Sequence, residues 1–222
     1  MTPDFLTAAV GLVAFLFSVI VHEVAHGWVA LREGDPTAYM LGRLTLNPIP
    51  HIDPIGSILV PLVLYMSHAG FLFGWARPVP VNTRNFRKYK RGDILVSLAG
   101  IAANLLLAVG FLLLALLCVL VARTIPGAMS VVPVVQAMAM IGIELNLLLA
   151  FFNIIPIPPL DGSHVFYYLL PPRLGAAYRD LGRFGMLLLL LILFVFPGVT
   201  RVFLWPAMFL QSQALALIPP LS

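Results

Sequence analysis

The chain begins with an apolar stretch that carries no charged residue between Asp4 and His22, and this stretch leads into the motif His22-Glu23-Val24-Ala25-His26. A stretch of this kind predicts a membrane-spanning helix, from about Phe5 to Leu31. Ionisable side chains at membrane depth are costly and are usually functional. The motif is therefore the first place to look for a functional site.

The composition also indicates a lipid environment. The 222 residues are 61% hydrophobic and 10% charged, whereas soluble domains are about 45–50% apolar and about 25% charged. The start, Met-Thr-Pro-Asp, lacks the basic region of a signal peptide, so we expect the first span to be retained. The net charge of +4 is concentrated in one loop, which indicates membrane orientation and no nucleic-acid partner.

Further apolar stretches predict an all-α polytopic membrane protein, a bundle of about four to six transmembrane segments. These stretches are 55–75, 94–121, about 131–157, and 184–219, the last split by Pro197-Gly198 and Pro206 into one or two passes. There is no internal repeat and no room for an appended soluble domain, so we expect residues 1–222 to form a single domain.

The basic loop 77–91 predicts the orientation, because cytoplasmic loops are rich in Lys and Arg. If the end of the first span also faces the cytoplasm, both flanks of 55–75 lie on one side, which predicts a small re-entrant or β-like element after the first span. The length of 55–75 favours a full crossing instead. We favour the partly inserted, proline-bent form, in which protein or a water cavity shields the non-helical backbone.

The spacing of the motif predicts a zinc site. His22 and His26 lie one turn apart on one helix face, where both imidazoles can reach one ion at about 2.0–2.1 Å. Glu23 between them is the residue type that acts as a general base toward water beside the metal. A catalytic zinc needs a third protein ligand.

Asp161 is the best candidate for that third ligand. It ends the segment Asn153-Ile-Ile-Pro-Ile-Pro-Pro-Leu-Asp161 and precedes Gly162; the prolines remove backbone donors and unwind the end of a membrane helix. The alternative is that Asp161 caps the next segment, 163–170. Beside the histidine motif we favour the ligand interpretation, with one Zn²⁺ per chain held by His22, His26 and Asp161.

His51 and Asp53 lie between prolines and are weaker candidates for the site. They could form a pair that supports the metal ligands, a gate or an extra ligand, and a simple loop cap with a hydrogen-bonded histidine is equally favoured. Glu144 is a further acid within a span, nine residues before Asn153 and so expected toward the opposite interface. His164 follows Asp161 closely; we expect a surface imidazole, with contact to the site as the alternative.

Together, His-Glu-Val-Ala-His-Gly and Asn-Ile-Ile-Pro-Ile-Pro-Pro-Leu-Asp-Gly resemble the site-2 protease family of intramembrane zinc metalloproteases, in the short form without PDZ or CBS domains. The segments 42–48, 51–56, 74–82 and 98–104 extend the resemblance, although this chain has Ala99-Gly100-Ile101 where many members have Ala-Gly-Pro. The resemblance implies a catalytic core over about 5–170 and C-terminal membrane segments over about 184–219. It implies zinc ligation by His22, His26 and Asp161 and general-base catalysis by Glu23. It also implies a polar group facing the reacting carbonyl, Asn153, with Asn104 as a further candidate.

The implied function is hydrolysis of peptide bonds within or near transmembrane segments, in the cell membrane, with the zinc site toward the cytoplasmic side. A transmembrane protein or peptide is the expected substrate, unwound by edge pairing around 40–47 or 77–82; a second copy or an upstream protease is a further expected partner. The alternatives are a metal transporter, for which repeat symmetry is missing, and an inactive scaffold, which has no need of Glu23. Substrate, cleavage position and any prior cut stay open.

Overall fold

In a computed structural model, which describes residues 5–66 and 76–221, all the regular structure is helical and no β-strand occurs in these ranges. Three of the helices are long and apolar enough to cross a membrane: α1 (Phe5–Glu33), α4 (Tyr89–Thr124) and α5 (Val132–Asn153). They correspond to the first, third and fourth apolar stretches. The predicted all-α membrane protein is therefore confirmed, with three candidate spans in the described part.

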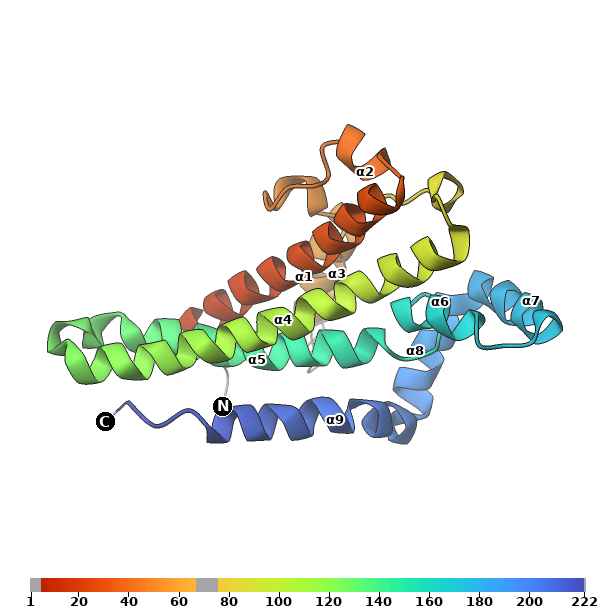
Figure 1. The fold of residues 1–222 in the computed structure, drawn as a ribbon. Helices are drawn as coiled ribbons and strands as arrows, with labels where there is room; N and C mark the ends of the chain where they lie inside the picture. Colours follow the sequence, from red (N-terminus) through yellow and green to blue (C-terminus); the bar gives the residue numbers. More distant parts are fainter. Residues whose placement is uncertain (1–4, 67–75, 222) are drawn as a thin grey trace.

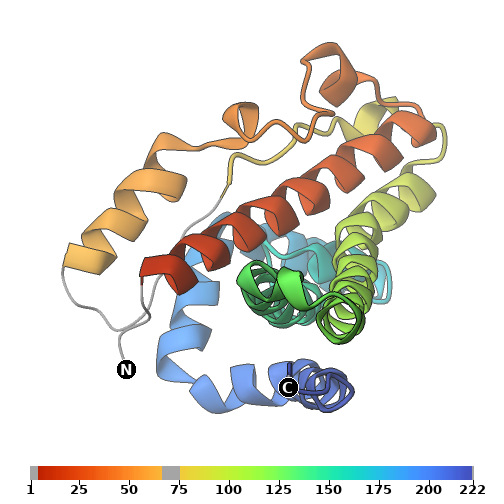
Figure 2. The same ribbon diagram turned by 90° about the vertical axis from the view of Figure 1, so that its left-hand side faces the viewer.

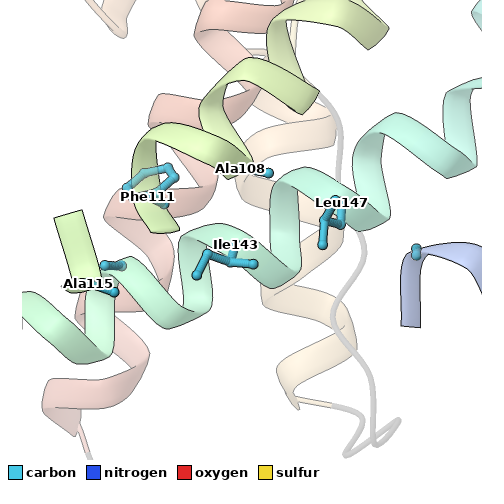
Figure 3. Packing of buried hydrophobic residues seen from close by; sticks show 7 residues of the cluster. Ala108, Phe111, Ala115, Ile143 and Leu147 are labelled. Carbon is cyan, nitrogen blue, oxygen red and sulfur yellow. The ribbon is translucent and has the colours of Figure 1, made fainter. Parts of the chain in front are cut away.

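The three long helices pack against one another. The helices α4 and α5 form a hairpin connected by η4 (Pro126–Ser130), and α1 lies alongside both (Figures 1 and 2). Small residues let the hairpin close tightly: Ala108 and Ala115 of α4 lie with Phe111 against α5 (Figure 3). A Cβ on Gly142 of α5 would lie 2.6 Å from the ring of Phe111, so only a glycine leaves room for that ring.

The region after α1 is formed by short helices. The helix α1 ends at Glu33, and the next residue, Gly34, has a φ of +114°, which favours glycine. There follow α2 (Thr37–Met40), η1 (Ile49–His51), η2 (Pro54–Leu59), α3 (Val60–Met66) and η3 (Thr83–Asn85). The stretch 55–75 thus begins as a helix, but 67–75 lie outside the described residues, so its crossing or re-entry stays a prediction. In the described residues on either side, no β-like element is found.

The C-terminal part is a series of shorter helices. These are α6 (Asp161–Tyr167), α7 (Pro172–Leu181), η5 (Gly182–Phe184), α8 (Gly185–Val195) and α9 (Pro197–Ala216). The break predicted at Pro197-Gly198 separates α8 from α9, whereas the break predicted at Pro206 is wrong, because this residue lies inside α9. The helix α9 packs along α5 (Figure 1). Neither helix is among the three candidate spans, so a count of four to six segments stays a prediction.

Candidate metal centre

The two histidines of the motif and Asp161 come together at one point between α1, α4 and α6. His22 and His26 are both buried, and their Nε2 atoms lie 3.0 Å apart. Oδ2 of Asp161, the first residue of α6, lies 3.3 Å from each of these nitrogens. Over the described ranges, this is the single group of three or more His, Cys, Asp or Glu side chains arranged to hold a metal ion.

The geometry of these three atoms fits zinc. A tetrahedral ion with bonds of about 2.0–2.1 Å keeps its ligand atoms about 3.3–3.4 Å apart, close to the 3.0, 3.3 and 3.3 Å edges found here. Oδ2 of Asp161 is buried and has no hydrogen-bond partner apart from the imidazoles. The chemistry of the donor set, two imidazoles and one carboxylate, is also that of catalytic zinc sites.

Gly100 of α4 keeps the space in front of the imidazoles open. A Cβ on this residue would lie 2.6 Å from Nε2 of His22 and 2.5 Å from Nε2 of His26. Any larger residue would therefore crowd both ligand atoms, and the helix α4 can approach the metal centre only because position 100 is a glycine.

Two oxygens on α4 fix the orientation of the imidazoles. Nδ1 of His22 lies 2.5 Å from Oδ1 of Asn104, and Nδ1 of His26 lies 2.7 Å from the carbonyl oxygen of Val96. Since both partners can only accept, each Nδ1–H donates to its oxygen, and each Nε2 lone pair faces Asp161. This is the tautomer that a metal ligand requires.

Asn104 belongs to a buried polar network that joins the three long helices. Its Nδ2 donates to Oδ1 of Asn146 over 2.8 Å, and Nδ2 of Asn146 donates to Oγ of Ser18 over 2.7 Å. Asn104 is thus held behind His22 by both ends of its amide, a different position from that of a donor facing the substrate. Sequence reasoning gave Asn146 and Ser18 no role; the spacing of Ser18 and His22, one turn apart on α1, was the available signal.

The carboxylate of Asp161 does not cap the following helix. The N-cap position of α6 is Leu160, and no side-chain cap bond is present there. The unwinding predicted from the prolines is confirmed, because no α-helix is present between Asn153 and Asp161. A Cβ on Gly162 would clash with the carbonyl oxygen of Ile154, so this glycine lets α6 fold back against the end of α5.

Glu23 lies outside the triangle of ligand atoms and contacts the segment 76–82. Its Oε2 accepts a hydrogen bond from the backbone N–H of Val79 over 2.8 Å. The guanidinium of Arg43 donates to the carbonyl oxygens of Arg77 (2.8 Å) and Pro78 (3.3 Å). The segment 76–82 is therefore fastened beside the motif by one side chain from α1 and one from the loop after α2.

The remaining predicted site residues are not part of the group of three candidate metal ligands. Nδ2 of Asn153 donates to the carbonyl oxygen of Leu149 in its own helix over 2.9 Å. His51 is buried and donates from Nε2 to the carbonyl oxygen of Thr45 over 2.9 Å. Oδ1 of Asp53 accepts from the backbone N–H groups of residues 55 and 56, at the start of η2. These contacts are those of the last turn of a helix and of a loop cap, and a substrate or gating role for the three residues stays a prediction.

Glu144 lies in the middle of its helix. It is exposed on α5, about 18 Å from the first residue of that helix at 1.5 Å per residue. The helix α5 ends at Asn153, short of the predicted 157, and the expected position of Glu144 toward the opposite interface stays a prediction.

Comparison with known proteins gives consistent matches. Residues 118–195, which include Asp161, match the profile of Peptidase family M50. The chain is 41% identical over 196 residues to the Bacillus subtilis (strain 168) protein named "Putative zinc metalloprotease YwhC", covering 88% of this chain and 84% of that protein. It is 32% identical over 193 residues to "Putative zinc metalloprotease Rip2" of Mycolicibacterium smegmatis, covering 86% and 69%. No solved structure matches the chain significantly.

Proposed function

Because the chain belongs to the site-2 protease-like peptidase family M50, a family of zinc metalloproteases, we propose that it cleaves peptide bonds within or near the transmembrane segments of other membrane proteins. The observation that carries the proposal is the triangle of His22, His26 and Asp161, built partly on a helix that is apolar enough to span a membrane. Ionisable side chains in a membrane-spanning helix are costly and are usually functional, which favours a substrate that lies in the membrane.

The roles of the residues follow from their positions. His22, His26 and Asp161 would hold the zinc, with Asn104 and the carbonyl group of Val96 keeping the imidazoles in the required tautomer. When bound, zinc supplies Lewis-acid polarisation of the peptide carbonyl and lowers the pKa of a water to about 7. Glu23 takes the proton from the attacking water and delivers it to the departing amine. The N–H of Val79 fixes the carboxylate of Glu23 for this task.

A helical substrate must unwind before it is cut, because a helix uses its own carbonyl groups in hydrogen bonds. Pro78 and Pro80 have no N–H, and the N–H of Val79 is bonded to Glu23. The segment 76–82 therefore offers few donors to an unwound substrate. We propose that its task is to hold Glu23. The backbone N–H groups of residues 40–43 are also bonded within the chain, so edge pairing around 40–47 or 77–82 stays a prediction.

The location of the basic residues supports a cytoplasmic orientation of the site in the cell membrane. Five exposed cationic residues lie in the loop before and at the start of α4: Arg84, Arg87, Lys88, Lys90 and Arg91. This loop contacts the end of α1, where Arg91 pairs with Glu33 over 3.4 Å. Cytoplasmic loops are rich in such residues, and His26 lies only about 10 Å along α1 from Glu33 at 1.5 Å per residue.

The test is a cleavage assay with purified protein in detergent, using a panel of model transmembrane peptides, wild type against Glu23→Gln. Glutamine keeps an oxygen for the N–H of Val79 but cannot accept a proton. We expect both proteins to bind about one zinc and only the wild type to cut, in a chelator-sensitive way. If zinc binds and neither protein cuts any peptide, the proposal fails, and zinc flux into proteoliposomes then tests the alternative of metal transport.

A further inference from the structure

The proposed third zinc ligand, Asp161, lies on a helix that is too short to be stable by itself. The helix α6 has seven residues, and Asp161 is the first of them. Helices of this length are marginal without tertiary contacts. The location of the Asp161 carboxylate therefore depends on what fastens α6 to the rest of the protein. Gly162 packs the start of α6 against α5, and a second attachment lies at its other end.

That second attachment is the carboxylate of Asp93. This residue lies in the first turns of α4 and is 6% exposed. Its Oδ1 lies 3.1 Å from Nδ1 of His164, and its Oδ2 accepts a hydrogen bond from the hydroxyl of Tyr168 over 2.8 Å. His164 and Tyr168 lie one turn apart, in α6 and directly after it, so both oxygens of one buried carboxylate bind the same short segment.

The position of Asp93 on α4 connects this attachment to the metal centre. Residues 93, 96, 100 and 104 follow one another at spacings of three and four, so they share one face of α4. Val96 and Asn104 hold the two imidazoles, and Gly100 leaves room between them. This single face thus touches both histidine ligands and the helix that carries the third ligand.

We propose that Asp93 is a positioning residue of the zinc centre: through His164 and Tyr168 it fastens α6 to α4 and keeps Asp161 within reach of His22 and His26. The proposal rests on the proposed zinc protease function. A purely structural role would make Asp93 contribute to the stability of the whole fold. A positioning role instead makes it act on zinc retention and turnover, while substrate affinity stays nearly unchanged.

The experiment measures the rate of zinc release into excess chelator for Asp93→Ala, Asp93→Asn and wild type. Removing groups that orient metal ligands typically costs 10–100-fold in metal affinity or activity. We expect release from Asp93→Ala to be at least tenfold faster than from wild type, with Asp93→Asn in between because it keeps one oxygen. The kcat for peptide cleavage should fall in the same order, with KM within about twofold of wild type.

The matched control is Asp180→Asn. Asp180 is an exposed acid on α7, and its ion pair with Arg183 is local, so this variant should release zinc at the wild-type rate. If Asp93→Ala does not fold, His164→Ala and Tyr168→Phe each remove one of the two bonds and should both accelerate release.

Two results would overturn the proposal. One is a folded Asp93→Ala protein, or both single-bond variants, releasing zinc at the wild-type rate. The other is the same acceleration in Asp180→Asn, which would show general destabilisation. A wild type that holds about one zinc but cuts no peptide counts against the proposed function alone, since the comparison of zinc release rates remains valid.

Discussion

Oδ1 of Asn104 lies 2.5 Å from Nδ1 of His22, and the other end of the Asn104 amide is bonded to Asn146. A side chain fastened in this way acts on the metal centre through the imidazole that it orients. It is fully buried, so its loss leaves the Nδ1–H of His22 without a partner.

We therefore expect Asn104→Ala to lower zinc affinity by about 10–100-fold, measured by competition with a chelator of known affinity. The control is Asn146→Ala. Asn146 contacts Asn104 and not the ligand itself, so this variant should lose less zinc affinity than Asn104→Ala. Equal zinc affinity in Asn104→Ala and wild type would show that the contact with His22 does not orient the ligand.

Gly100 gives a second prediction. A methyl group on this residue would lie within 2.6 Å of the Nε2 atoms of His22 and His26, so Gly100→Ala should abolish zinc binding while the protein still folds. Gly110→Ala is the matched control on the same helix, because a Cβ there has no atom within 4 Å. It should leave zinc binding intact and stabilise α4 slightly, by about 0.5–1 kcal/mol. The number of zinc ions per chain is measured by elemental mass spectrometry. About one zinc per chain in Gly100→Ala would refute this packing argument.

The bond between Val79 and Glu23 gives a third prediction. Val79→Pro removes the N–H that fixes the Glu23 carboxylate, whereas Val79→Ala shortens the same side chain and keeps the N–H. General-base catalysis typically raises the rate by about 10²–10⁴-fold. Because the proline variant loses part of this contribution, we expect its kcat to fall about tenfold or more, with its zinc content unchanged. Equal rates for the two variants would mean that the N–H of Val79 is not needed.

Asp35 predicts a pH dependence of stability. It is completely buried after the end of α1 and accepts hydrogen bonds from the backbone N–H groups of Thr37 (3.2 Å) and Asn82 (2.7 Å) and from Nδ2 of Asn85 (2.7 Å). Burial alone raises the pKa of its carboxyl group, but the hydrogen bonds from Thr37, Asn82 and Asn85 outweigh it and lower the pKa. A lowered folded-state pKa means that the carboxylate stabilises the fold above its unfolded-state pKa of about 3.9.

This stabilisation is lost as the pH falls through the lowered folded-state pKa. Asp35→Asn should therefore be less stable than wild type near pH 7, by about 1–3 kcal/mol for the unsatisfied donors, and the difference should shrink below about pH 4. Denaturant unfolding in detergent at several pH values measures it. A difference that stays constant down to pH 2 would contradict the assignment.

The parts that sequence could predict are those that depend on local pattern. Uninterrupted hydrophobicity predicted α1, α4 and α5, and the spacing of His22 and His26 placed both imidazoles on one face. The prolines before Asp161 predicted the unwound backbone that frees its carboxylate. Each of these signals lies within one segment of the chain, where a single physical rule decides the outcome.

The partners of these residues could not be predicted in the same way. That Val96 and Asp93 would bind His26 and His164 depends on how α4 docks against α1 and α6, which no local pattern records. Asn104 was expected near the site through resemblance, but its position behind His22 follows from the packing of the three long helices.

The most direct test of the zinc centre is X-ray absorption at the zinc K-edge on purified protein. We predict about one zinc per chain with only nitrogen and oxygen ligands at about 2.0–2.1 Å, two of them imidazoles, and loss of this signal in His22→Ala and Asp161→Ala. A sulfur ligand at about 2.3 Å, which Cys118 would supply, or a signal unchanged in both variants would contradict the assignment of His22, His26 and Asp161.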